Sequence, residues 1–311
     1  MLRLRKKEVF SPGWVGLAPL GDHVRVAHVV CRVGERPALR WVCQAPWGDD
    51  PAQALRGLRR SRSLNRQRTV AVLQRAQYQL LPMEAPEVPR AEWRDALRWR
   101  LKDMVDFAVA DAGIELLEVP AGPAQRRAPS LIAVAAPHSA LGPLADAGTD
   151  AGLPWHAIDV PETALRNIAA LAEEPGRGQA LLHVGEADST LVVTWQGELL
   201  LSRHIDLSLA QLTDPDESTR QQSYERASLE LQRTLDSVER QHSHANLARL
   251  LVAPGAPLEE FIRYVGDLVY VPVAAFDLAA LIDLSAVPEL ADVREQAAYL
   301  PAIGAALRGA H

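Results

Sequence analysis

One supersecondary pattern occurs twice along this chain of 311 residues, and it limits the fold more than any other feature of the sequence. Each copy consists of strand, loop, strand, turn and strand. In the first copy Pro19 and Gly21 separate the first two strands and Gly34 turns the chain, while in the second the loop spans 185–189. The repetition predicts two similar lobes, each built on its own sheet. The predicted strands are 14–17, 24–30 and 38–43, then 180–184, 190–195 and 199–205.

Helical periodicity accompanies these strands in the second half. From Tyr224 onward, apolar side chains recur on one helical face, at Ala227, Leu231, Leu235 and Val238. Strands alternating with helices predict an α/β fold with helices packed on the sheets. Further along, the patterns indicate strands at 249–253 and 271–276, a helix at 258–268, and a short closing helix at 301–307 that begins at Pro301.

A different pattern separates the two copies and begins at a cluster of prolines, Pro82, Pro86 and Pro89. A helical stripe follows at Trp93, Leu97, Leu101, Met104 and Val105. Trp99 falls off that stripe and faces either solvent or a second surface. Strands at 114–119 and 130–135, a loop at 122–129 between them and a second loop at 146–152 complete an inserted α+β subdomain.

These patterns divide the chain into four parts. We predict a first lobe (1–85), an inserted subdomain (86–150), a return to the first lobe with the link between lobes (151–175), and a second lobe (176–311). The last helix packs either on the second lobe or back on the first lobe. The predicted fold class is α/β and bilobed.

Charge and hydropathy limit the function classes. The net charge of -6 and the pI near 5.9 give no broad basic field, so we expect no nucleic-acid binding. The basic start, Arg3, Arg5, Lys6 and Lys7, is either a solvated tail or a contact with anionic lipid headgroups. No run approaches the ~18 apolar residues that span a bilayer, and Pro12 interrupts any signal-peptide core, which predicts a cytoplasmic chain.

Common enzyme motifs are missing from the sequence. There is no Walker A pattern, GxGxxG, GxSxG or HExxH. His242-Ser243-His244 offers two imidazoles that do not share a helix face, so a helix cap or solvent-exposed role is expected there and no metal site is predicted.

The order of the segments resembles the PilM/MshI family of type IV and mannose-sensitive haemagglutinin pilus biogenesis proteins, a branch of the actin-like ATPase superfamily. The opening motif of that family is VGxDIGxxxVKxV, and residues 15–26 (VGLAPLGDHVRV) occupy the same frame. Residues 96–107 (ALRWRLKDMVDF) look like its RW-helix, 158–167 (IDVPETALRN) like the segment joining the lobes, and 229–236 (LELQRTLD) like its EIQRSLD helix. The resemblance spans nearly the whole chain and implies a bilobed actin-like (ribonuclease H-like) fold with an inserted α+β subdomain.

The resemblance also implies where a nucleotide would bind, and there this chain departs from the family. Active members place one aspartate in each phosphate loop to organise Mg²⁺ and the attacking water. Ala18 and His183 occupy those two positions here, and Leu20 replaces a neighbouring glycine. Losing both carboxylates is expected to cost several kcal/mol of transition-state stabilisation. We therefore expect no hydrolysis, no metal site and no required cofactor, with weak ATP binding left open.

Remnants of the nucleotide loops are the candidate cofactor residues: Gly21, Gly185, Ser189, Thr190 and Gly255. The last lies between Pro254 and Pro257, where the family usually carries a GGG motif and where proline removes backbone donors. The loop acids Asp22, Glu186 and Asp188 either substitute for the lost aspartates after a loop shift or are solvated.

Relatives in this family hold the N-terminal cytoplasmic peptide of a bitopic inner-membrane partner, PilN-like, in a groove beside the inserted subdomain. The resemblance places the partner site near 93–107, with Trp93, Trp99, Asp106 and Phe107 as candidate contacts. It implies a non-catalytic scaffold of pilus assembly, peripheral to the inner membrane. The alternatives are an actin-like ATPase or filament, and the cytoplasmic domain of a type II secretion component.

Overall fold

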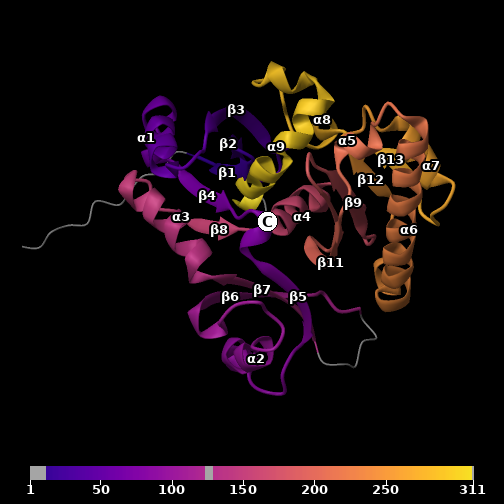
Figure 1. Ribbon diagram of the computed structural model, residues 1–311, viewed down its shortest axis with the longest axis horizontal. Coiled ribbons are helices and arrows are strands. Elements are labelled where there is room, and N and C mark those ends of the chain that lie inside the picture. The colour runs from indigo at the N-terminus through magenta and orange to yellow at the C-terminus, as the bar shows by residue number, and fades with distance from the viewer. Residues whose placement is uncertain (1–11, 123–128, 310–311) are drawn as a thin grey trace, which may run out of the picture.

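The computed structural model describes residues 12–122 and 129–309, and the chain forms two five-stranded mixed sheets and a third, three-stranded sheet (Figure 1). The first sheet has the order β3-β2-β1-β4-β8 and the second has the order β11-β10-β9-β12-β13. In both, three antiparallel strands continue into parallel ones, so the pattern repeated in the sequence is repeated in space. The fold is α/β, bilobed and actin-like, with an inserted α+β subdomain.

The first lobe alternates its apolar side chains between two helix layers. Val15 and Leu17 of β1 pack toward α1, whereas Gly16 and Ala18 face α9. The side chain of Asp50 accepts a hydrogen bond from the Gln53 amide and so caps α1. The elements are β1 (Trp14–Leu20), β2 (His23–Val30), β3 (Ala38–Pro46), α1 (Pro51–Arg62), β4 (Arg68–Val72), α3 (His138–Asp150) and β8 (Ala157–Asp159).

The second lobe covers its sheet with α4 on the face toward the first lobe and with α6 and α7 on the other side (Figure 1). Asp216 is the N-cap residue of the long helix α6, and its carboxylate accepts a hydrogen bond from the Thr219 amide. The elements are α4 (Pro161–Leu171), β9 (Gln179–Val184), β10 (Ser189–Trp195), β11 (Glu198–Ile205), α5 (Leu209–Leu212), α6 (Glu217–Gln241), β12 (Leu250–Ala253), α7 (Glu259–Gly266), β13 (Val273–Ala275) and α8 (Leu278–Leu281).

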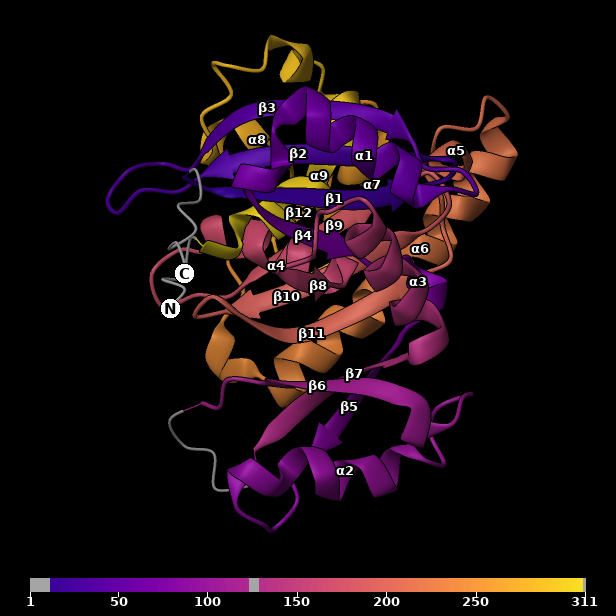
Figure 2. The ribbon, with the colours of Figure 1, turned by 90° about the vertical axis from the view of Figure 1, so that its left-hand side faces the viewer.

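The inserted subdomain is a sheet of order β5-β7-β6 with one helix on its face (Figure 2). Its elements are β5 (Gln79–Glu84), α2 (Trp93–Leu101), β6 (Ala112–Glu118) and β7 (Ser130–Pro137). Strand β6 also contacts β11, the edge strand of the second lobe. The side chains of Val119 and Ile132 join the large core shared by both lobes. The insertion therefore touches both lobes and does not project freely into solvent.

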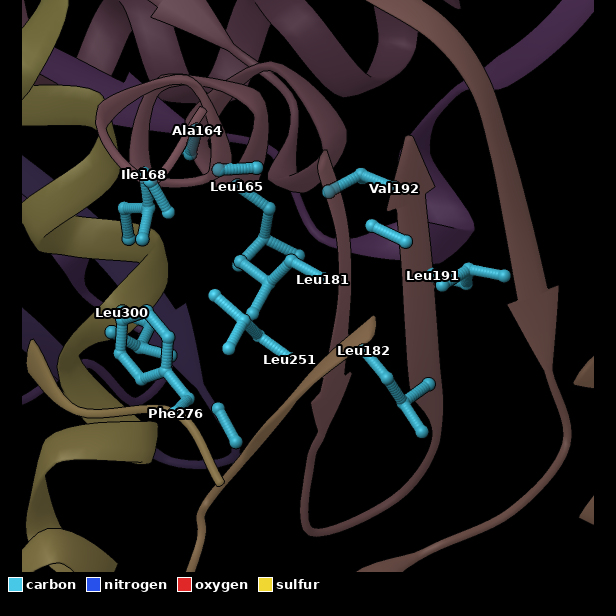
Figure 3. Close-up of a cluster of buried hydrophobic side chains, with 14 of the residues drawn as sticks. Ala164, Leu165, Ile168, Leu181, Leu182, Leu191, Val192, Leu251, Phe276 and Leu300 are labelled. Atoms are coloured by element: carbon cyan, nitrogen blue, oxygen red, sulfur yellow. The ribbon is translucent and has the colours of Figure 1, made fainter. Parts of the chain in front are cut away.

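Helices α4 and α9 (Val293–Ala306) cross between the two sheets. The crossing is close because small residues meet there: a Cβ added to Gly304 of α9 would overlap the carbonyl oxygen of Ala164. The side-chain amide of Asn167 then donates to the Gly304 carbonyl at 2.8 Å. Figure 3 shows the neighbouring side chains of α4, Leu165 and Ile168, facing the interior of the second lobe. The two lobes therefore share one core at this crossing.

Two predicted segment boundaries move. Strand β5, predicted within the first lobe (1–85), belongs to the insertion sheet, and α3, predicted within the insertion (86–150), packs against α1. Strand β5 belongs to the insertion because Gln79 to Glu84 pair directly with β7. The prolines in and after this segment made a strand hard to predict from the sequence. Arg3, Arg5, Lys6 and Lys7 and part of the predicted loop 122–129 lie outside the described residues.

Three local predictions were wrong. The predicted loop 146–152 is mostly the end of α3, because Ala147 and Gly148 are buried against the first lobe despite their weak helix signal. Pro301 lies inside α9 instead of beginning it. Helix α2 ends at Leu101, so Met104 is exposed and does not continue the apolar stripe. In each case tertiary packing outweighed local propensity.

Candidate functional site

The first phosphate loop is the turn between β1 and β2. Gly21 adopts a left-handed conformation with φ of 59°, which glycine tolerates better than other residues, and space is open around the position of an added Cβ. Ala18 is 5% exposed and packs in the core. The Oδ1 atom of Asp22 lies within hydrogen-bond distance, 2.5 Å, of the Nδ1 atom of His23. Asp22 is exposed beside this turn.

The second phosphate loop uses its polar groups internally. The Gly185 amide donates to the Asp188 carbonyl at 2.8 Å, and the Gly185 carbonyl accepts from the Leu209 amide at 2.9 Å. Ser189 is buried, and its hydroxyl donates to the Leu207 carbonyl at 2.6 Å. Thr190 is also buried. The Gly185 amide and the Ser189 hydroxyl therefore already donate within the chain, whereas a phosphate-binding loop directs its donors toward the ligand.

His183, expected at the position of the second aspartate, contacts the chain itself. Its Nε2 atom lies 2.9 Å from the carbonyl oxygen of Ala297 in α9, and its side chain shares a sheet face with Thr190. Burial lowers the pKa of His183, although the Ala297 carbonyl opposes the shift. A neutral imidazole bonded across to α9 links the second-lobe sheet to the helix between the lobes.

The turn after β12, predicted to lie on the adenosine side, packs against other parts of the chain. Gly255 follows β12, and a Cβ added to it would lie 2.7 Å from the Cβ of Ala275. The Gly255 carbonyl accepts the Leu258 amide at 2.9 Å. Gly255 therefore permits close packing of the turn against the end of β13.

Acidic side chains near these loops are dispersed. Glu186 is exposed, and Asp188 lies 3.8 Å from the Nδ1 atom of His204. Across residues 12–122 and 129–309, no group of three or more His, Cys, Asp or Glu side chains is arranged to hold a metal ion. At the end of α6, His242 is the C-cap residue and the ring of His244 packs 4.7 Å from that of Trp195.

One acid at the junction of the lobes was missed by the sequence analysis. Glu162, in the first turn of α4, is 4% exposed and accepts a hydrogen bond from the Tyr78 hydroxyl at 2.5 Å. Burial raises the pKa of Glu162, with the Tyr78 hydrogen bond opposing the shift, and burial followed by the Glu162 charge raises the pKa of Tyr78. Glutamate early in a helix usually signals a favourable dipole contact, so sequence alone offered no sign of this pair.

The four candidate partner contacts differ in their environment. Trp93 is partly buried, and its indole N–H donates to the Val88 carbonyl at 3.1 Å. Phe107 packs in the core of the insertion. Trp99 is 77% exposed, with the Lys102 ammonium 5.4 Å from its ring centre. Asp106 is exposed and accepts from the Gln79 side chain at 2.5 Å. Trp93 and Phe107 therefore support the insertion, whereas Trp99 and Asp106 face outward.

A cavity of about 250 Å³ lies between the first lobe and the start of the insertion. It has both apolar and polar walls, and its lining includes Pro19, Gly21, Trp47, Val72, Gln74, Gln77 and Leu144. Gln77 is two residues from Gln79, the hydrogen-bond partner of Asp106. The segment from Gln77 to Gln79 therefore contributes both to the cavity lining and to the hydrogen bond with Asp106.

Together, these features define an actin-like fold in which the candidate nucleotide residues contact other parts of the chain. No protein-family model matches the chain, and no curated protein matches its sequence. Among solved structures, the chain is similar to the "PilM-PilN type IV pilus biogenesis complex", with a TM-score of 0.71, 20% identity, and coverage of 96% of this chain and 99% of that chain.

Two further structures are more distant. One is the cytoplasmic domain of EpsL, an inner-membrane component of the type II secretion system of Vibrio cholerae, with a TM-score of 0.49, 12% identity and coverage of 85% and 86% of the two chains. The other is a Bacteroides thetaiotaomicron protein with an actin-like ATPase fold, with a TM-score of 0.49, 9% identity and coverage of 96% and 98%.

Proposed function

We propose that this protein is a non-catalytic scaffold of type IV pilus assembly that binds the N-terminal cytoplasmic peptide of a PilN-like inner-membrane protein. The observation that carries the proposal is the likeness to the PilM chain of a PilM–PilN complex over almost the full length of both chains. We further propose that the chain belongs to the MshI branch and acts in the cytoplasm, at the inner membrane. None of the helices within the described residues combines the length and apolar composition of a bilayer span.

The nucleotide loops support a scaffold over an ATPase. Ala18 supplies no ligand, His183 is bonded to the Ala297 carbonyl, and the Gly185 amide is bonded within its own loop. Phosphoryl transfer depends on positioned positive charge and metal-binding carboxylates. We therefore propose that neither ATP nor Mg²⁺ is required, and that any nucleotide binds weakly at Gly21, Gly185, Ser189, Thr190 and Gly255.

The partner site is proposed on the side where the insertion joins the first lobe. Trp99 offers a large exposed aromatic surface, which is typical of an interface hot spot. Asp106 and the cavity beside Gly21 extend the same region toward the first lobe. Trp93 and Phe107 hold the helix and the following turn in place from within. In this arrangement an extended peptide contacts Trp99 and Asp106 and inserts a side chain into the cavity.

The test is peptide binding by the full chain, measured by fluorescence anisotropy with the labelled cytoplasmic peptide of the membrane partner. Trp99→Ala is expected to weaken binding by about tenfold or more, as loss of an aromatic hot spot does. Leu229→Ala is the matched control, because Leu229 is an exposed apolar residue on α6 of the second lobe. Equal affinity of Trp99→Ala and the unsubstituted chain would show that the site lies elsewhere.

A further inference from the structure

The first lobe contains a segment in which arginines far outnumber carboxylates. Between residues 12 and 78 there are eleven arginines and four carboxylates, although the whole chain has a net charge of -6. From Pro51 to Met83 there is no acidic residue at all. A separation of charge of this kind creates a local field that the net charge conceals.

Six of these arginines lie from the middle of α1 through the segment that follows it, and we call this set the arginine face. It comprises Arg56, Arg59, Arg60, Arg62, Arg66 and Arg68, and all six are exposed. They begin at Arg56, midway along α1, and continue to Arg68 at the start of β4; the part on the helix, Arg56 to Arg62, is about 9 Å long. Figure 2 shows α1 outermost on the first sheet, on the side away from the second lobe.

Several of these side chains are held in position by the fold. The Arg62 guanidinium lies 4.9 Å from the centre of the Trp41 ring, and that of Arg68 lies 5.6 Å from the Trp14 ring. Arg59 donates to the Ala151 carbonyl at 3.3 Å. Arginine stacked on tryptophan combines charge with an apolar body, a combination suited to the boundary between water and lipid.

Carboxylates near the arginine face neutralise only part of it. Asp50 lies 3.4 Å from Arg56, and Asp49 precedes it in the chain. The neighbouring helix α3 carries Asp146 and Asp150, both exposed. Six guanidinium groups against these four carboxylates leave a net charge of +2 on this part of the lobe.

The shape of this surface favours an extended anionic plane over a small ligand or an enclosed peptide. The arginines are spaced along a helix and do not converge on one point. The cavity beside Gly21 takes none of its lining residues from α1. We propose that the arginine face docks on the anionic headgroups of a phospholipid membrane. This docking goes beyond the proposed peptide binding and does not depend on it.

The test is cosedimentation of the full chain with vesicles of phosphatidylcholine and phosphatidylglycerol in equal parts, and with vesicles of phosphatidylcholine alone. Binding is expected only to the anionic vesicles and is expected to weaken as salt is added. Arg60→Gln with Arg66→Gln is the test variant, because within the described residues neither side chain has a hydrogen bond or ion pair whose loss would disturb the fold. Each neutralised arginine should lower the partition coefficient about fivefold.

The matched control is Arg233→Gln with Arg240→Gln on α6, which removes the same charge from the second lobe. It should bind anionic vesicles like the unsubstituted chain. Equal losses in both variants would overturn the proposal, and so would unchanged binding of the Arg60/Arg66 variant, which would place the contact elsewhere, for example on Arg3, Arg5, Lys6 and Lys7. Binding of duplex DNA, or self-association that needs Arg60 and Arg66, in the absence of vesicle binding would also overturn it.

Discussion

Two residues at the candidate nucleotide positions, Ala18 and His183, make contacts within the protein. Ala18 fills the core beneath the first loop, and His183 bridges the second-lobe sheet to α9 through the Ala297 carbonyl. An aspartate at position 183 would place a charge in this buried setting unless a cation accompanied it. Ala18 and His183 therefore contribute to the packing and to the link between the second-lobe sheet and α9.

The buried pair of Tyr78 and Glu162 makes stability depend on pH. Burial raises the pKa of Glu162 from its ordinary value of 4.5, so the folded chain binds this proton more tightly than the unfolded chain does. The contribution of Glu162 to the free energy of unfolding is therefore full below pH 4.5 and is lost as the pH rises through the raised folded pKa. Glu162→Gln, which keeps an acceptor for Tyr78, should remove this decline.

The measurement is urea unfolding of the unsubstituted chain and Glu162→Gln between about pH 5 and pH 8, where their difference isolates this group from other titrations. The difference should move in favour of the variant as the pH rises. A constant difference across the range would contradict the prediction. Buried His183, whose pKa is lowered, has the opposite trend and is common to both proteins.

A companion substitution tests the hydrogen bond itself. Tyr78→Phe leaves the buried Glu162 carboxyl without its tyrosine donor and should cost about 1–3 kcal/mol of the free energy of unfolding near neutral pH. The same change combined with Glu162→Gln should cost less, because the amide carries no charge. Chemical denaturation of the single and double variants measures this coupling, and purely additive effects would show that the two side chains do not interact.

At the scale of elements, the crossing of α4 and α9 holds the two lobes on one core. Gly304 and Ala164 allow the helices to approach, and Asn167 donates a hydrogen bond across the contact. Strand β1 is equally close to α9, because a Cβ on Gly16 would overlap the Ala302 carbonyl. Small residues at these positions are therefore a requirement of helix packing.

Gly304→Ala is expected to destabilise the protein by about 1–3 kcal/mol, since the added methyl group forces the helices apart. The control is Gly57→Ala in α1, where nothing lies within 4 Å of the added Cβ. That change should be neutral or stabilise by up to about 1 kcal/mol through helix propensity. Thermal or denaturant unfolding compares the two, and equal effects would refute the packing argument.

At the scale of the whole molecule, the question is whether the two lobes still cooperate around a nucleotide. We expect calorimetric titration of the full chain with ATP to show no binding tighter than about 1 mM, and no gain when Mg²⁺ is added, because both aspartate positions lack a carboxylate. Titration with ATP in the absence of Mg²⁺ is the control. Tight binding that requires magnesium would restore the ATPase alternative and overturn the scaffold proposal.

Much of the architecture was predictable because it follows from repeated local patterns. The six strands of the two repeats all form, and α6 presents the predicted face of Ala227, Leu231, Leu235 and Val238 to the core. Whether Trp99 and Asp106 bind a partner stays a prediction, although both are exposed, whereas Trp93 and Phe107 pack within the insertion.

By itself, the sequence determined the strands of the two repeats and the long helix, because each depends on residues close together in the chain. Only the tertiary structure decided that Pro301 lies inside a helix, that β5 pairs in the insertion sheet, that Glu162 is buried against Tyr78, and that the arginines from Arg56 to Arg68 are exposed. Those features join residues that are distant in the chain or depend on which face of an element is covered. Burial and long-range pairing then outweigh the weak preferences of any single segment.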